Sequence, residues 1–334
     1  MGDKAIDILD NELNDMQSKY LLKVMQGEYK EIPPYSDDNP IECDENSLLS
    51  FVVWGDPQIS SLSPLRSARV FRAHTDIMAS KTVFDALVLV GDITEYGKQK
   101  EYKMMAQFMR HMQSKVDKFF AVPGNHDIRI RNYKSQVKQF SSFMASVQNG
   151  VPNPEDRYWF SSDVKGYKFI MLGSDSNTFE GSYISDKQLE WLDDELKNAD
   201  KNKPVFVFNH QPLKFTNGLP MTFLGRGKWR GSVGWQSDKL RAVFEKYENV
   251  IYITGHLHYC TSEYTYEDCG NFKAINAPTV GVINHGPFKK FTQGLIFSVF
   301  EDRIEVRSRV FGEGRYAPDD IKNSKFVINL PKGE

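Results

Sequence analysis

Five short apolar runs, rich in β-branched and aromatic residues, alternate with amphipathic patterns between residues 50 and 253. The runs are SFVVW at 50–54, ALVLV at 86–90, FFAV at 119–122, VFVF at 205–208 and VIYI at 250–253. Their length and composition are those of buried strands. The stretches between them carry apolar residues at helical spacing, for example Val70, Phe71, His74, Ile77 and Met78. This alternation predicts an α/β fold, in which helices cover a sheet.

Each of the five runs is followed by a side chain of a type that binds metal ions. These side chains are Asp56, Asp92, Asn125, His210, and His256 with His258. Ligand sites in α/β sheets lie at the carboxyl ends of the strands, so we expect the five segments to meet in one crevice. A single Asp or His at a strand end is usually a turn residue or a cap. Five at successive strand ends favour a functional site.

The predicted ligands mix oxygen and nitrogen donors, which suit Mn, Fe or Zn better than Ca or Mg in an all-oxygen cage. Six donors exceed what a single catalytic ion with three protein ligands needs. Two ions about 3.5–4 Å apart, sharing a carboxylate, would use all of them and acidify a water for attack at phosphorus. We therefore predict two divalent metal ions (Mn, Fe or Zn) as cofactors.

Composition excludes several classes of function. The 334 residues include 42 basic and 44 acidic side chains, a formal net charge of −2, which argues against a dedicated nucleic-acid or membrane-surface binder. No apolar run approaches the ~18 residues of a membrane span. The segment MGDKAIDILDNELND lacks the basic start and apolar centre of a signal peptide, and an odd count of three cysteines predicts free thiols. We expect a cytoplasmic protein.

The chain divides into three predicted parts. Residues 1–46 contain an amphipathic helix and an extended connector, residues 47–311 the catalytic domain, and residues 312–334 a C-terminal extension. Within the domain, the runs 294–300 and 303–311 are expected to pair across Glu301 and Asp302. Three roles are open for the N-terminal part: packing on the domain, dimerisation and guarding the site.

Five motifs occur in a fixed order along the chain. They are Gly55-Asp56-Pro57-Gln58, Gly91-Asp92-Ile93-Thr94-Glu95-Tyr96-Gly97, Gly124-Asn125-His126-Asp127, His210, and Gly255-His256-Leu257-His258. Together they resemble the calcineurin-like metallophosphoesterase superfamily over about residues 49–310. The resemblance implies an α/β fold, a four-layer α/β/β/α sandwich of two facing mixed β-sheets flanked by helices, with a dinuclear metal site at the strand ends.

The resemblance also implies a role for each motif residue. Asp56 and His258 would bind the first metal and Asp92 would bridge, while Asn125, His210 and His256 would bind the second. A metal-bridging hydroxide would be the nucleophile. His126 would stabilise the phosphoryl charge or protonate the leaving oxygen, and Glu95 would orient His126. Asp127 is expected to cap its turn.

Two positions depart from the family pattern. Gln58 stands where the commonest motif has His, and its amide oxygen is a weaker ligand than imidazole, so direct metal contact by Gln58 is open. Tyr96 replaces the Arg that protein serine/threonine phosphatases use to grip phosphate. Protein phosphatase activity of that kind is therefore not expected.

Further candidates for substrate binding lie in loops. His285 follows the last ligand motif, and Arg129 follows the motif of Asn125. Residues 211–236 form a long loop in which Arg226 and Arg230 are interleaved with aromatic rings, as in lids and binding loops. Cations there would grip phosphate and rings would stack on a planar group. An ordinary packed surface loop is the alternative.

The predicted function is hydrolysis of a small-molecule phosphoester, with a phosphodiester such as a cyclic nucleotide favoured because the double-His GHxH ending resembles phosphodiesterase-like branches. Hydrolysis of a phosphomonoester is the alternative within the same fold. A scaffold that has lost its chemistry fits poorly, because such relatives lose ligands. A nuclease fits poorly with the near-neutral charge.

Overall fold

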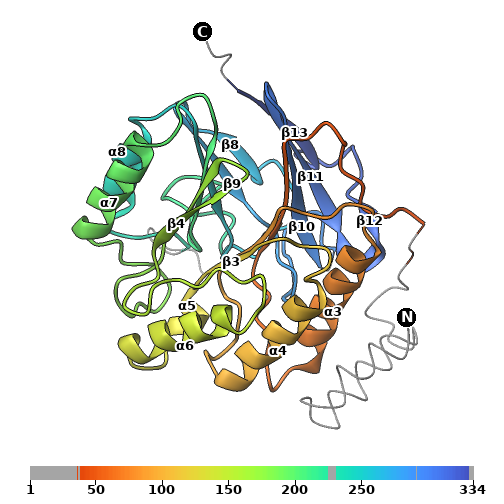
Figure 1. Ribbon diagram of the computed structural model, residues 1–334, viewed down its shortest axis with the longest axis horizontal. Helices are drawn as coiled ribbons and strands as arrows, with labels where there is room; N and C mark the ends of the chain where they lie inside the picture. Colours follow the sequence, from red (N-terminus) through yellow and green to blue (C-terminus); the bar gives the residue numbers. More distant parts are fainter. Residues whose placement is uncertain (1–35, 37, 225–230, 291, 331–334) are drawn as a thin grey trace.

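A computed structural model of the protein describes residues 36, 38–224, 231–290 and 292–330. The predicted N-terminal helix lies outside these residues. The described strands form two mixed sheets, which face each other at the centre of the molecule (Figure 1). Within the described residues, no helix has the length and apolar composition needed to cross a membrane.

The first sheet has the order β12-β11-β10-β1-β2-β3, and β13 also pairs with β11. Its strands are β1 (Leu49–Trp54), β2 (Ala86–Val90), β3 (Phe119–Val122), β10 (Gln293–Val299), β11 (Arg303–Val310), β12 (Arg315–Tyr316) and β13 (Lys325–Asn329). Strands β1, β2 and β3 run parallel, while β10 is antiparallel to β1. The carboxyl ends of β1, β2 and β3 therefore lie at one edge, where the first three motifs begin.

The second sheet has the order β4-β5-β6-β7-β9-β8. Its strands are β4 (Phe160–Val164), β5 (Tyr167–Met171), β6 (Val205–Phe208), β7 (Val250–Thr254), β8 (Tyr266–Asp268) and β9 (Phe272–Asn276). The four inner strands run parallel and the two edge strands are antiparallel to their neighbours. Strands β6 and β7 thus deliver the last two motifs at one end of this sheet.

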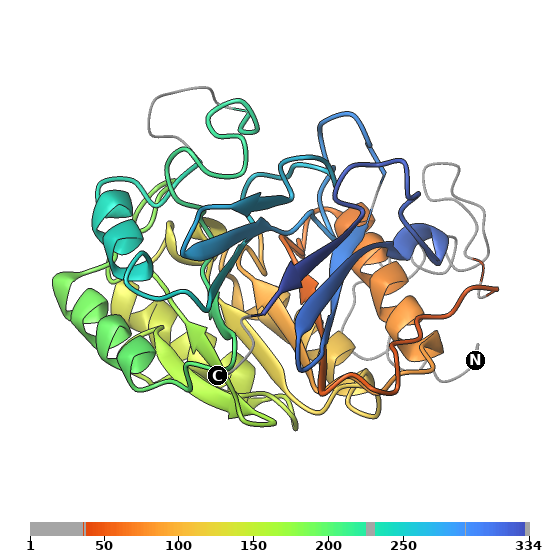
Figure 2. The same cartoon turned by 90° about the horizontal axis from the view of Figure 1, so that it is seen from above.

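Helices cover the outer face of each sheet. The helices are α3 (Pro64–Ala79), α4 (Gln99–His111), α5 (Asn125–Ile128), α6 (Tyr133–Ala145), α7 (Asp186–Lys197) and α8 (Ser237–Phe244), followed by the 3₁₀ turn η1 (Phe311–Glu313). Helices α3, α4 and α6 pack on the first sheet, and α7 and α8 pack on the second. Figure 2 shows α3 and the α7–α8 pair on opposite sides of the strands. The predicted four-layer sandwich is confirmed.

Successive side chains of β1 point to opposite faces of the first sheet, so this strand packs against two layers of the fold. Val52 and Trp54 pack toward the helices of the first sheet, whereas Phe51 points into the core between the sheets. There the Phe51 ring stacks on Phe297 of the same sheet at 4.4 Å and meets Phe206 of the facing sheet edge-on at 4.9 Å. This aromatic core fixes the two sheets against each other and so fixes the site that both supply.

The segments predicted to flank the domain are joined to it. Strands β12 and β13 lie within the predicted C-terminal extension, yet both pair with β11. In the predicted connector, Ile41 is fully buried, and the Asn39 carbonyl accepts a hydrogen bond from Arg309 at 2.8 Å. The described parts of both segments are therefore continuous with the sandwich. The predicted hairpin is confirmed, since β10 and β11 pair with Val299 opposite Ile304.

Candidate metal centre

The polar side chains at the strand ends meet between the two sheets. Asp56 and Asp92 follow strands of the first sheet, and His210 follows β6 of the second. His210 Nε2 lies 3.3 Å from Asp92 Oδ1 and 3.9 Å from Asp56 Oδ1. All three side chains are buried. The crevice expected from the sequence is thus formed by both sheets together.

Two groups of potential ligands share one carboxylate. Asp56, Asp92 and His258 form one group, and Asp92, His210 and His256 form the other, with the ligand atoms of each group within 4.8 Å of one another. His258 Nε2 lies 3.2 Å from Asp56 Oδ1, and His256 Nδ1 lies 3.1 Å from His210 Nε2. Asp92 belongs to both groups. Two ions bridged by a carboxylate require this arrangement.

Buried polar atoms at the site fit a bound cation. Among the described residues, Asn125 Oδ1 and His256 Nε2 are buried without a hydrogen-bond partner. Such an atom costs about 1–3 kcal/mol when it stays unsatisfied. The second nitrogen of His210, Nδ1, lies 2.8 Å from the Val90 carbonyl oxygen, which leaves Nε2 to face the site. Imidazole, amide and carboxylate donors of this kind suit a transition-metal ion or zinc.

The electrostatics of the site also favour positive charge. Burial acts to raise the pKa of Asp92, but His210 and His126 beside it hold that pKa below its usual range. Burial acts to lower the pKa of His210, yet the Asp92 carboxylate raises it to about 9. The pKa of His256 lies well below its usual value, because of burial and the neighbouring His210. The negative charge of Asp92 that raises the pKa of His210 also attracts a divalent ion. Such an ion competes with the proton for the lone pair of the His210 imidazole.

The backbone at the site is strained. Asp56, Gln58, Asp92, His256 and His258 all have positive φ, between 38° and 70°. Residues other than glycine adopt such angles at a cost of order 1–3 kcal/mol each, and these conformations concentrate at functional sites. The strain aims each side chain from a strand end into the crevice.

Two glycines that directly precede candidate ligands, Gly91 and Gly124, are required there for steric reasons. A Cβ atom on Gly91 would overlap the His210 ring, and one on Gly124 would overlap the Asp92 carboxylate. Gly91 also has a φ of 87°, which favours glycine. Only glycine lets these strand ends approach the ligands so closely.

His126 lies at the edge of the site. Its backbone nitrogen donates to Asp92 Oδ1 at 2.8 Å, and its Nε2 lies 3.8 Å from Asp92 Oδ2. Its Nδ1 lies 3.3 Å from Glu95 Oε2, and Glu95 also forms an ion pair with Arg66. Burial acts to lower the pKa of His126, but Asp92 and Glu95 raise it to about 9. An imidazole held in this way can hold a proton close to the ligand groups.

Gln58 is buried and faces the shared carboxylate. Its Nε2 donates to Asp92 Oδ2 at 3.2 Å. The amide nitrogen thus helps to hold the Asp92 carboxylate in place through a hydrogen bond. The amide oxygen is the atom of this side chain that can bind a metal.

The predicted substrate-binding residues fall into different places. Arg129 Nη2 lies 2.9 Å from His126 Nδ1, and its guanidinium lies over the Phe179 ring. His285 Nε2 lies 2.9 Å from the Thr222 carbonyl oxygen, so this ring ties the 211–236 loop to the segment after β9. Arg226 and Arg230 lie outside the described residues. Substrate binding by all four stays a prediction.

One ring of the 211–236 loop reaches the ligands directly. Phe223 stacks on His256, with ring centroids 5.1 Å apart and planes 21° apart. The loop therefore covers the side of the site that holds His210 and His256. Substrate binding by this loop stays a prediction.

A cavity of about 460 Å³ borders the site. Gln58, His126 and His258 line it together with Arg66 and Arg69 of α3. Neither arginine was predicted from the sequence to line the site. Their spacing of three residues on an amphipathic helix directly after the first motif was the available signal.

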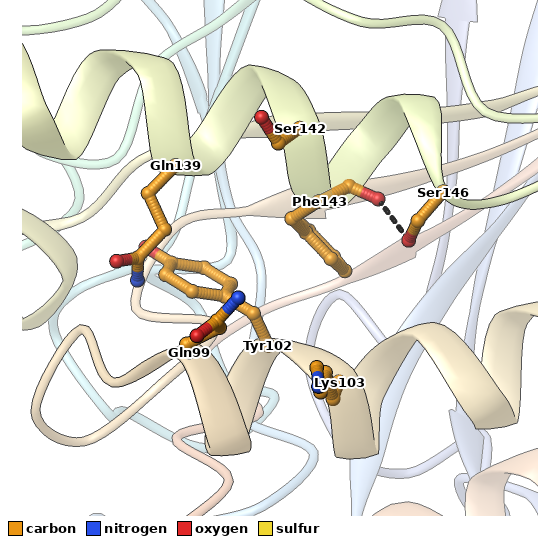
Figure 3. Close-up of a pocket in the computed structure, with 7 residues that line it drawn as sticks. All are labelled: Gln99, Tyr102, Lys103, Gln139, Ser142, Phe143 and Ser146. Carbon is orange, nitrogen blue, oxygen red and sulfur yellow. Dashed lines mark hydrogen bonds between the residues drawn. The ribbon is translucent and has the colours of Figure 1, made fainter.

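A second cavity, of about 140 Å³, lies between α4 and α6 (Figure 3). Tyr102 and Lys103 of α4 and Gln139 and Phe143 of α6 are among its lining residues. Its lining contains no carboxylate, imidazole or thiol. It therefore lacks the groups that a metal site needs.

Comparison with known proteins places these observations in a family. A probable glycerophosphodiester phosphodiesterase from Arcobacter nitrofigilis is 25% identical over 178 residues, which is 52% of this chain and 56% of the relative. A 3′,5′-cyclic-nucleotide phosphodiesterase from a Nostoc strain is 26% identical over 175 residues, 52% of this chain and 56% of the relative. The chain thus matches little more than half the length of these relatives.

Solved structures share the fold. A dimetal phosphatase from Danio rerio superposes with a TM-score of 0.52 at 17% identity, covering 85% of this chain and 100% of the other. A purple acid phosphatase from yellow lupin superposes with a TM-score of 0.58 at 14% identity, covering 89% of this chain and 55% of the other. The family model described as calcineurin-like phosphoesterase matches residues 49–260. Since this match covers more than half of the sequence, the chain belongs to the calcineurin-like phosphoesterase family.

Proposed function

We propose that the protein is a phosphoester hydrolase that depends on two divalent metal ions, Mn, Fe or Zn, and acts on a phosphodiester such as a small or cyclic nucleotide-like molecule. The observation that carries this proposal is the pair of ligand groups that share Asp92. Membership of the calcineurin-like phosphoesterase family supports it.

The ligand assignment follows the two groups and adds Asn125, whose Oδ1 is buried without a hydrogen-bond partner among the described residues. Asp56 and His258 would hold the first ion, Asp92 would bridge, and Asn125, His210 and His256 would hold the second. Two ions at such a site supply an acidified water as nucleophile and stabilise charge on the phosphoryl oxygens. Titration of the wild type and of Gln58→His with Mn tests direct binding of the first ion by the Gln58 oxygen.

The chain's own residues would handle the proton and the orientation. His126 can donate a proton from Nε2 toward the leaving oxygen, because its imidazole lies at the open edge of the ligand groups. Glu95 would hold His126 in position through Nδ1. Burial of Asp56, Asp92 and His210 excludes bulk water from the ligand side and strengthens the electrostatic interactions there.

Phosphodiesters are favoured because the matched relatives from Arcobacter nitrofigilis and Nostoc are named phosphodiesterases. Hydrolysis of phosphomonoesters is the second candidate, and it is favoured by a mouse protein named acid phosphatase type 7, which is 25% identical over 143 residues. A small-molecule substrate fits a cavity of about 460 Å³. We also propose a cytoplasmic location, which the free thiols of Cys43, Cys260 and Cys269 support.

The test is hydrolysis by the Mn-reconstituted protein of bis-p-nitrophenyl phosphate and of p-nitrophenyl phosphate in parallel, with Asp92→Asn as the control. We expect diester turnover that the variant loses by orders of magnitude, with its circular dichroism unchanged. A preference for the monoester would instead support the second candidate. Near-normal turnover in Asp92→Asn would refute the assignment of the bridge.

A further inference from the structure

The cavity of about 460 Å³ borders the ligand groups. It meets them at Gln58, His126 and His258, which border the Asp56–Asp92–His258 group. The Phe223 ring covers His256. A phosphoester held at the metals has room to extend along the cavity toward α3.

Two arginines of α3 line one wall of this cavity, and Arg66 forms an ion pair with Glu95. Arg66 and Arg69 lie three residues apart in the first turns of α3, so their side chains lie on one face of the helix. Arg69 is only 4% exposed, and its Nη1 donates to the carbonyl oxygen of Gly281 at 3.2 Å. The Gly281 nitrogen in turn donates to the Asp56 carbonyl oxygen, which ties Arg69 to the metal-ligand segment. The guanidinium of Arg69 is thus held in place beside the cavity.

The start of α3 adds to this wall. Ser63 is the N-cap residue and also lines the cavity, and in the described part of the chain its hydroxyl makes no capping hydrogen bond. The positive end of the helix dipole points the same way as the arginine side chains of the first turns. Guanidinium groups beside a helix N-terminus recognise phosphate and carboxylate, because both offer planar or clustered oxygens.

Part of the cavity lining is apolar. Leu65, Val282 and Ile283 also line the cavity, and Ile283 is 59% exposed. Carbon atoms of a substrate fit against these side chains, while a charged group fits against the arginines. The lining therefore matches a molecule with one anion at the metals, a short carbon-rich spacer and a second anion at α3.

We propose that this cavity binds a second anionic group, a phosphate or a carboxylate, carried on an ester arm of the substrate, with Arg69 as its principal contact. This inference rests on the proposed phosphodiester hydrolysis and names the class of substrate for it. Water adds at the reacting phosphorus and one P–O ester bond breaks, so one alcohol leaves. The second anion does not react and only fixes the arm that carries it.

The test uses two esters that differ in one phosphate. They are thymidine 5′-(p-nitrophenyl phosphate) and the same ester with a 3′-phosphate, and both release nitrophenolate. We expect kcat/KM of the Mn-loaded protein to be about tenfold to a hundredfold higher for the phosphorylated ester, the size expected of charge-assisted hydrogen bonds. In Arg69→Gln this ratio should fall close to one. Arg110→Gln, which changes an exposed arginine of α4, should keep the ratio.

A binding measurement separates this inference from the catalytic proposal. Calorimetry with thymidine 3′,5′-bisphosphate and thymidine 5′-phosphate should show about tenfold tighter binding of the bisphosphate, and Arg69→Gln should remove the difference. Hydrolysis of both esters with equal kcat/KM would overturn the second-anion site and leave the hydrolase intact. No hydrolysis, with Arg69-dependent tight binding of the bisphosphate, would overturn the hydrolase and keep the site. Should Arg69→Gln not fold, the wild-type comparison of the two ligands decides alone, since equal binding overturns the inference.

Discussion

The His126 side chain borders both the shared carboxylate and the cavity. We expect His126→Ala to lower kcat about 10²–10⁴-fold, because the variant lacks the group that can protonate the leaving oxygen. The ligand groups do not include His126, so the metal content measured by plasma mass spectrometry should stay at two ions per chain. Loss of metal in His126→Ala would show that the imidazole binds an ion instead.

Gln58→His tests the one ligand position at which this chain departs from the common motif. The amide already lies at hydrogen-bond distance from Asp92 Oδ2, so an imidazole there would point toward the same ion. Imidazole is the stronger ligand, and titration with Mn should give a lower dissociation constant for the variant. Gln58→Leu, which is of similar size and has no donor atom for Mn, serves as the control and should not bind Mn more tightly than the wild type. Equal Mn affinity in wild type and Gln58→His would mean that this side chain acts only through its hydrogen bond.

Asp127 joins two elements of the first sheet. Its carboxylate accepts hydrogen bonds from the backbone nitrogens of Ile93, Thr94 and Gly124 at 2.9–3.0 Å, so it ties the turn after β2 to the start of α5. This confirms the capping role expected from the sequence. Asp127→Ala leaves three buried N–H groups without this partner, and urea unfolding should show a loss of about 3 kcal/mol. Asp117→Ala, at an exposed carboxylate, should change stability by less than ~0.5 kcal/mol.

The strands that are buried on both faces could be predicted from the sequence. The strands that contain polar residues could not. The apolar runs at 86–90, 119–122 and 205–208 coincide with β2, β3 and β6, because a parallel strand that is covered on both faces is apolar throughout. Strands β5 and β9 were missed because Lys168 and Lys273 interrupt them. Strand β4 is a partly exposed edge strand with the sequence FSSDV, which carries no apolar run.

At the scale of the whole molecule, the meeting of the candidate ligand residues could be predicted because each of them follows a strand, and parallel strands bring their ends together. The cavity wall could not be predicted in this way. Arg69 reaches the site only because α3 packs on the first sheet and the segment of Gly281 lies against it, a contact between residues 212 positions apart. Such a contact depends on the finished packing of both sheets rather than on a local pattern.

The stability of the whole fold should depend on pH through His74, a buried residue on α3 far from the motifs in sequence. Burial, and then the neighbouring His111, lower the pKa of His74 to about 3, whereas an unfolded chain has a His pKa near 6.5. Between these values the unfolded state binds one more proton, so this contribution to stability is complete above pH 6.5 and is lost as the pH falls. The loss approaches 1.4 kcal/mol per pH unit, or about 2 kcal/mol between pH 6.5 and 5.

We expect His74→Phe to remove this part of the acid sensitivity, because phenylalanine keeps the ring contacts with Phe71 and Phe108 but takes up no proton. Urea unfolding of metal-free protein at pH 6.5 and pH 5 should show a drop in free energy that is about 2 kcal/mol smaller for the variant than for the wild type. His111→Gln, which removes only the smaller cause, should recover a minor share of that difference. Equal drops in wild type and His74→Phe would mean that His74 is protonated in the folded protein at pH 5, against the direction that its burial imposes.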